Sequence, residues 1–384
     1  MEIVQDMNYL NDGFHRSMEG SGWKEEPQRF ERDRLTELSH LQDDLVDRTY
    51  ETLPGSEFTL NERGHPRHIH GGRMRDRVVR HTLCDNILTP TFERFQIYSN
   101  GASQTGKGVD FARRRFERDL HNFYLEHCNN SGYVQFVDFS KFYDNIRHDR
   151  IKEVMLPKLD EYSGWLFLKI VESFSVDVSY MSDEQFACCL DEKFNSIEYY
   201  DTVPVEKRTG EKWMEKGVDI GDQVSQNIGV FFPTRIDNYV TIVRSIGRYG
   251  RYMDDMYMIH EDKEYLKETM KGIIREASEL GLFVNEKKTR LVPLSSRFTY
   301  LQRIYTLSDT GKVIKKITPK AVTRERKRIK AYKRLLDKGE MKYPAIEQAV
   351  RSWMGGNVKV MSKDQVHNMK QLYKDLYGKE LRWK

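Results

Sequence analysis

Three aspartates stand where a protein could hold divalent cations. Asp254 and Asp255 are adjacent, and both flanks of the pair are apolar or aromatic, so the two carboxylates lie where a strand would otherwise be buried. Neighbouring aspartates in a loop are usually only solvated, but burying two charges without a cation is costly. Asp138 ends another apolar segment. Carboxylate oxygens suit magnesium, and two such ions about 4 Å apart support phosphoryl transfer. The pattern therefore favours metal-assisted phosphoryl transfer.

Strands are predicted on either side of these acids. Residues 133–139 alternate as a strand does, and residues 247–260 form two short apolar strands with the acidic pair at their turn. Residues 283–294 and 297–307 are also predicted as strands, whereas the Arg-rich segment 62–72 is predicted as a loop. Helical patterns cover residues 35–53, 75–95, 109–127, 228–243 with an interruption near Pro233, 265–280, and most of 318–384.

Composition and charge distribution indicate what kind of partner the protein binds. The 384 residues can bury a sizeable core, while 32% of them are charged and the net charge is only +4. Charge is unevenly distributed, because Lys312 to Arg334 holds eleven basic residues and a single acid, Glu325. A segment this basic suits a phosphate backbone.

The four cysteines show no metal-ligand spacing and are expected to be free thiols in a reducing compartment. No apolar run approaches the roughly 18 residues that span a bilayer, and the N-terminus lacks the apolar stretch of a signal peptide. We therefore expect a soluble, cytoplasmic protein that has no membrane partner.

The acidic motifs resemble those of reverse transcriptases. Tyr252-Met253-Asp254-Asp255 is similar to the Tyr-x-Asp-Asp signature of that family, and the segment from Asp138 to Tyr143 is similar to the preceding palm motif. Order and spacing agree with the family from about Arg73 to Tyr305. The resemblance implies an α+β right-hand polymerase with fingers, a palm of antiparallel sheet backed by helices, and a short helical thumb. It also implies two Mg²⁺ ions held by Asp138, Asp254 and Asp255, with Mn²⁺ as a substitute.

The resemblance divides the chain into five parts. These are an N-terminal extension (1–60), fingers (61–132), a palm with fingers elements and an insertion or hairpin at 175–216 (133–296), a primer-grip hairpin (297–317) and a basic helical thumb (318–384).

Further site residues are implied by the same resemblance. Tyr143 stands at the position of the steric gate that excludes a ribose 2′-hydroxyl, although it could also be an ordinary core tyrosine. Lys288 matches a lysine near the departing pyrophosphate, although most lysines are surface residues. Other nucleotide-binding candidates are Phe139, Gly221, Ser225, Gln226 and three arginines that could equally solvate a helix, Arg73, Arg75 and Arg77. Candidate nucleic-acid contacts are Tyr252, Met253, Leu301, Gln302, Arg324, Arg326, Lys327, Arg328 and Lys330.

One position departs from the common pattern of the family. Most members carry Gln before the motif's glycine and many carry Pro after its serine, whereas this chain has Ile220 and Gln226. This form resembles bacterial reverse transcriptases of diversity-generating retroelements, in which the missing polar contact is associated with error-prone copying. The expected fidelity is therefore low.

RNA-directed DNA synthesis is the expected activity, with an RNA template, a DNA or RNA primer, and deoxynucleoside triphosphates. The template could be a structured non-coding RNA, and an accessory protein could take part. Three alternatives stay open: the same activity used in anti-phage defence, an RNA-directed RNA polymerase, and a catalytically inactive RNA-binding protein. Tyr143 argues against the second, and the full set of acids argues against the third.

Overall fold

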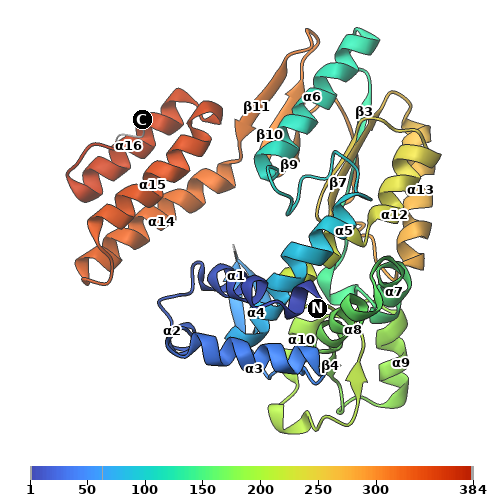
Figure 1. Ribbon diagram of the computed structural model, residues 1–384. Helices are drawn as coiled ribbons and strands as arrows, with labels where there is room; N and C mark the ends of the chain where they lie inside the picture. The colour runs from blue at the N-terminus through green and yellow to red at the C-terminus, as the bar shows by residue number, and fades with distance from the viewer. Residues whose placement is uncertain (1, 63, 382–384) are drawn as a thin grey trace. The chain divides into compact units, whose positions relative to one another are not determined.

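The computed structural model describes residues 2–62 and 64–381, and they form an α+β fold of helices and small antiparallel sheets (Figure 1). The chain divides into two compact units. The first comprises residues up to Ala112, Gln135–Met258 and Glu264–Arg290. The second comprises Arg113–Val134, Ile259–Lys263 and the chain from Leu291 onward.

The N-terminal helices belong to the core of the first unit. Leu10 and Phe14 of the first helix are fully buried, and Gly13 lets that helix approach α4 closely. A methyl group at Gly13 would lie 2.3 Å from Oγ1 of Thr82, which leaves no room for a side chain. The helices concerned are α1 (Met7–Met18), α2 (Glu25–Arg32), α3 (Arg34–Val46) and α4 (Met74–Leu83).

The helix expected over residues 75–95 is α4 continued by a π-helical turn (Cys84–Leu88) and α5 (Thr89–Glu93). The one expected over 228–243 is broken at Pro233, as predicted, because proline cannot donate the backbone hydrogen bond of a continuous helix. The remaining helices around the central sheet are α6 (Val109–His127), α7 (His148–Val154), α8 (Glu161–Glu172), α11 (Gln223–Phe231), α12 (Thr234–Asn238) and α13 (Lys263–Glu279).

The central sheet has four strands in the order β6-β7-β3-β8. They are β6 (Tyr249–Tyr252), β7 (Asp255–His260), β3 (Tyr133–Val137) and β8 (Arg290–Pro293). The strand expected over residues 283–294 is wrong for its first part, since only β8 is extended. Residues before it turn back instead, with the amides of Lys288 and Thr289 donating to the carbonyl of Asn285.

A β-hairpin replaces the loop predicted for residues 62–72, and that prediction is wrong. Strand β1 (Ser56–Glu62) pairs antiparallel with β2 (His65–Gly71). Every residue of β1 is exposed, although Phe58 and Leu60 share one face of the strand and are each 50% exposed. Two apolar residues are too short an alternation to predict a strand, so the pattern did not indicate the hairpin.

Residues 175–216 form a small folded segment, called the insertion below, rather than a simple hairpin. It consists of β4 (Val176–Asp177), α9 (Asp183–Asp191), α10 (Ser196–Thr202), a 3-10 turn (Val205–Lys207) and β5 (Trp213–Met214), with β4 and β5 paired antiparallel. The insertion has its own buried core of Val176, Val178, Phe194, Tyr199, Val203 and Met214.

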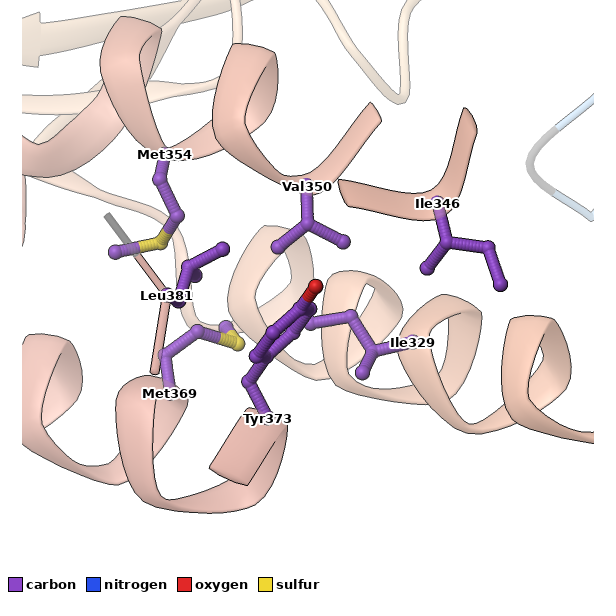
Figure 2. Close-up of a cluster of buried hydrophobic side chains, with 7 residues drawn as sticks. All are labelled: Ile329, Ile346, Val350, Met354, Met369, Tyr373 and Leu381. Carbon is purple, nitrogen blue, oxygen red and sulfur yellow. The ribbon is translucent and has the colours of Figure 1, made fainter. Parts of the chain in front are cut away.

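The second unit contains a three-stranded sheet and a helical bundle. Strands β9 (Phe298–Tyr300), β10 (Arg303–Leu307) and β11 (Val313–Ile317) pair antiparallel. The basic C-terminal segment is helical, as expected, and forms α14 (Pro319–Asp337), α15 (Tyr343–Asn357) and α16 (Lys363–Tyr377). Figure 2 shows the apolar side chains that pack between these helices, among them Val350, Met369 and Tyr373.

All four cysteines are free thiols. Within the described residues, every helix is too short or too polar to traverse a lipid bilayer.

Candidate active site

The acidic pair lies at a two-residue hairpin turn, as the sequence predicts. Tyr252 pairs with Asp255 at the end of the β6–β7 ladder, so Met253 and Asp254 form the turn itself. Met253 has a φ of 55°, in the left-handed region that residues with a Cβ rarely adopt. The surroundings must therefore hold this turn in place.

A buried ion pair supplies that support. Arg251 and Asp237 are both fully buried, and their side chains meet at 2.7 Å. The hydroxyl of Tyr249 donates to the same carboxylate at 2.7 Å. Arg251 also donates to two backbone carbonyls, that of Val230 in α11 and that of Met253 in the turn. One guanidinium therefore ties the acidic turn to two neighbouring helices.

Asp138 follows β3, the neighbour of β7 in the sheet. Its backbone carbonyl accepts from the amide of Asn285 at 2.8 Å, and its Oδ2 lies 3.2 Å from Nζ of Lys288. The turn that begins at Asn285, where a strand was expected, is thus the segment that holds Asp138 in place. Lys288 reaches the acids from a largely exposed position.

The three acids interact electrostatically. Burial raises the pKa of Asp254, and the negative charge of Asp138 raises it further. Burial, Asp254 and Asp138 together raise the pKa of Asp255 to about 7. Carboxylates that disfavour one another's ionisation form a concentration of negative charge, which Lys288 and Arg67 offset only in part at Asp254.

These residues suit a divalent cation. Oδ1 of Asp138 is buried and has no hydrogen-bond partner among the described residues. No three His, Cys, Asp or Glu side chains in residues 2–62 and 64–381 are grouped so that they could hold a metal ion by themselves. Magnesium is usually bound through one or two carboxylates plus substrate phosphates rather than by an all-protein cage, so the acids present fit it.

Tyr143 lies beside the acidic turn. Its hydroxyl is 3.8 Å from the sulfur of Met253, and burial followed by the charge of Asp254 raises the pKa of Tyr143 to about 12. Gly229 of α11 makes room for the ring, since a methyl group there would lie 2.9 Å from the Tyr143 hydroxyl. Phe139 is buried and bridges to Val284. The backbone around Tyr143 is therefore fixed from several directions.

The loop before α11 is shaped by a glycine and a buried ion pair. Gly221 has a φ of 98°, and Asp222 caps the helix by accepting from the amides of Val224 and Ser225. Arg80 of α4 holds Asp222 at 2.6 Å, with both side chains buried. Ile220 is half-buried, and Gln226 is exposed.

Residues 82–304 match the family model for "Reverse transcriptase (RNA-dependent DNA polymerase)". The match covers more than half of the chain. The chain belongs to the reverse transcriptase family. It is an RNA-directed DNA polymerase, and hence a nucleotidyltransferase. No curated protein matches the chain.

Three arginines expected to bind nucleotide in this reverse transcriptase already have protein partners. Arg73 donates to the carbonyl of Pro54, Arg75 bonds to Asp44, and Arg77 donates to the carbonyl of Ser17. Arg75 also lies over the ring of Tyr50. In this structure the three side chains anchor the N-terminal segment to α4.

Arg67 is the cation that sequence reasoning missed. It lies on β2, is exposed, and forms an ion pair with Glu62 at 2.9 Å. Its positive charge partly offsets the rise in pKa that burial causes at Asp254 and at Tyr143. Arg67 is therefore within electrostatic reach of Asp254 and Tyr143.

The reverse transcriptase's second unit contains the other expected nucleic-acid contacts. Leu301 and Gln302 form the β9–β10 turn with φ values of 41° and 65°, and Arg113 donates to the carbonyl of Leu301 at 2.6 Å. A left-handed pair without Gly or Asn is unusual for such a turn. The basic candidates of α14 are all exposed: Arg324, Arg326, Lys327, Arg328 and Lys330.

Proposed function

We propose that this reverse transcriptase copies RNA into DNA by two-metal nucleotidyl transfer within a bacterial or phage retroelement. The observation that carries the proposal is that Asp138 follows β3 while Asp254 and Asp255 stand at the start of the neighbouring strand β7, with the Tyr143 hydroxyl 3.8 Å from the sulfur of Met253 in the same turn. Divalent cations bound there would activate the primer's 3′-hydroxyl and neutralise the leaving pyrophosphate.

Each side chain then has a distinct role. Asp138 and Asp254 are the main ligands, and Asp255 supports them. Tyr143 closes the space that a ribose 2′-hydroxyl would need. We assign the triphosphate to Arg67, because its charge extends to Asp254 and its ion pair with Glu62 is exposed, whereas Arg73, Arg75 and Arg77 are bonded to the N-terminal segment. Lys288, which lies 3.2 Å from Asp138, is placed to donate a proton to the departing pyrophosphate.

The arrangement supports a right-hand polymerase. In this proposal residues 61–132 contribute the fingers, 133–296 the palm, 297–317 the primer grip and 318–384 the thumb. Leu301 and Gln302 would hold the primer's end, and the exposed basic side chains of α14 would follow the duplex backbone. Tyr252 and Met253 would meet the primer strand beside the acids.

Primer extension tests the proposal. The purified protein with Mg²⁺, an RNA template and an annealed DNA primer should extend the primer with deoxynucleotides and should lose activity when EDTA is added. Asp254→Asn should abolish extension while the protein stays folded. Tyr143→Ala should raise the use of ribonucleotides. Extension by Asp254→Asn at the wild-type rate would contradict the proposal. So would a wild-type enzyme that prefers ribonucleotides to deoxynucleotides.

The low expected fidelity has its own test. Ile220 offers no polar contact where most relatives have glutamine, so Ile220→Gln should lower the misincorporation frequency. Sequencing the DNA products of both enzymes on one template measures the effect. Indistinguishable error spectra would refute this role of Ile220.

Anti-phage defence with a structured non-coding RNA is the second candidate role, because the motifs fit both. Sequencing the RNA that copurifies with the protein, and any DNA attached to it, separates the two. A template and variable repeat beside the gene would support the retroelement. Phage protection by the gene alone would support defence.

A further inference from the structure

One short helix of the insertion reaches both sides of the proposed nucleotide site. The first residue of α10, Ser196, donates through its hydroxyl to Oδ1 of Asp144 at 3.0 Å. Asp144 directly follows Tyr143 in the chain. The N-terminal end of α10 is thus bonded to the residue next to the proposed steric gate.

The same face of α10 contacts the β1–β2 hairpin one turn later. Tyr200 is four residues after Ser196, which places both on one side of the helix. Its ring stacks on His68 of β2, with the centroids 3.7 Å apart and the planes inclined by 13°. His68 directly follows Arg67, the residue to which we assign the triphosphate. Arg208 lies over the Tyr200 ring as well and is 3.5 Å from Glu57 of β1.

The insertion is itself firmly attached to the gate segment. The amide of Phe194 donates to the side chain of Asn145 at 2.8 Å, and Asn145 donates back to the carbonyl of Phe194. The ammonium of Lys216, which is fully buried, donates to three carbonyls at the C-terminal end of α9, those of Cys189, Leu190 and Glu192. A positive charge at a helix C-terminus is favourable. These bonds therefore hold the insertion, and α10 within it, in a fixed position relative to the segment that contains Tyr143.

The hairpin, by contrast, has little support of its own. All of β1 is exposed, and a two-stranded hairpin is marginally stable in isolation. Its position must come from the contacts that its side chains make. Tyr200 stacking on His68 and Arg208 pairing with Glu57 are two of them, and both come from the insertion.

We propose that α10 sets the distance between Tyr143 and Arg67, so that Ser196 and Tyr200 are positioning residues for the incoming nucleotide. The inference rests on the proposed function, because it takes Tyr143 as the gate and Arg67 as the triphosphate contact. Neither Ser196 nor Tyr200 touches the nucleotide. Ser196 acts through Asp144, which follows Tyr143, and Tyr200 acts through His68, which follows Arg67.

Steady-state kinetics with a deoxynucleoside triphosphate tests the proposal. Tyr200→Ala should raise the KM for the nucleotide by roughly two- to tenfold, the range expected from losing one stacked aromatic pair, while kcat is retained. Tyr200→Phe keeps the stack and should restore the wild-type KM. Tyr180→Ala is the matched control, since Tyr180 is an exposed aromatic residue of the same insertion. A Tyr200→Ala enzyme with the wild-type KM would overturn the proposal.

Hydrogen exchange of the hairpin provides a readout that needs no catalysis. Tyr200→Ala and His68→Ala should each speed exchange in residues 56–71 of the nucleotide-free protein, and the double variant should add little to either. Equal exchange in wild type and both variants would overturn the positioning role, whatever the activity. If the wild type did not extend primers but the variants still speeded exchange, the proposed function would fail while the contact stood.

Discussion

At the scale of single residues, the space around Tyr143 is set by a glycine. A methyl group at position 229 would lie 2.9 Å from the Tyr143 hydroxyl and 3.2 Å from Cζ, so the ring would have to move. Tilting a side chain about 30° away from its rotamer costs about 0.5–1.5 kcal/mol. The ring that would have to move is the one we assign to nucleotide selection.

Gly229→Ala should therefore raise the KM for deoxynucleotides roughly two- to tenfold. The closest atom is the hydroxyl oxygen, so adding Tyr143→Phe should recover part of the loss. Gly247→Ala is the matched control, because a methyl group at that position meets no atom within 4 Å. Steady-state kinetics on the three variants checks the expectation, and equal KM values for Gly229→Ala and wild type would contradict it.

At the scale of elements, the acidic hairpin depends on the buried pair of Arg251 and Asp237. Asp237→Asn keeps the shape of the side chain but removes its negative charge. Arg251 is then buried without a countercharge. Breaking such a pair costs about 3–5 kcal/mol. Urea unfolding should show this loss. Arg235→Gln, two residues earlier in α12, removes a half-exposed partner of Glu276 and should cost about 1 kcal/mol or less. Similar losses for both variants would refute the role assigned to the buried pair.

The β1–β2 hairpin should respond to pH through His70. Its Nδ1 lies 2.9 Å from Oδ2 of Asp219, and the interaction with that carboxylate raises the pKa of His70. Because the folded state holds this proton more tightly than the unfolded state, the stabilisation is complete below the unfolded pKa of about 6.5. It is lost as pH rises through the raised pKa.

His70→Gln should therefore lower the free energy of unfolding by roughly 1 kcal/mol near pH 6 and by less near pH 9. Urea unfolding at both pH values measures the two differences. Asp219→Asn should remove the same pH dependence, which serves as the control. A penalty for His70→Gln that does not change with pH would count against the pair.

Elements with a buried apolar face were predictable from the sequence, and elements without one were not. Strand β3 and the β6–β7 hairpin are buried along most of their length and contain short apolar runs, so their bounds could be predicted to within a few residues. Strand β1 has no buried residue, and the insertion's small core is assembled from short segments that have no period. Arg67 was missed for that reason, since its electrostatic effect on Asp254 depends on a hairpin whose apolar alternation is only two residues long. The partners of Arg73, Arg75 and Arg77 come from distant segments and could not be foreseen either.

At the scale of the whole molecule, the charge of α14 should govern how binding depends on salt. Arg324, Lys327 and the other exposed cations of α14 would displace counterions from a nucleic acid. Arg328 differs, because it pairs at 2.8 Å with Glu325, which is 3% exposed. Removing Arg328 would leave that carboxylate buried and unpaired.

Lys327→Gln should reduce the slope of log affinity against log salt by about one, with unchanged stability. Arg328→Gln should instead lower the melting temperature of the protein. Fluorescence anisotropy with an RNA–DNA duplex between 50 and 200 mM KCl, together with thermal unfolding, separates the two effects. If Lys327→Gln had the wild-type dependence of affinity on salt, α14 would not be part of the nucleic-acid-binding surface.

The bend at Leu301 and Gln302 has a practical consequence for anyone who wants a more heat-tolerant enzyme. Two left-handed residues with side chains cost about 1–3 kcal/mol each in backbone strain. Replacing Leu301 and Gln302 with Asn and Gly would relieve that strain. Such a repair would also loosen the loop assigned to the end of the growing strand. Extra durability is better sought at Gly355 and Gly356, inside α15, where a methyl group meets no neighbouring atom and alanine favours the helix.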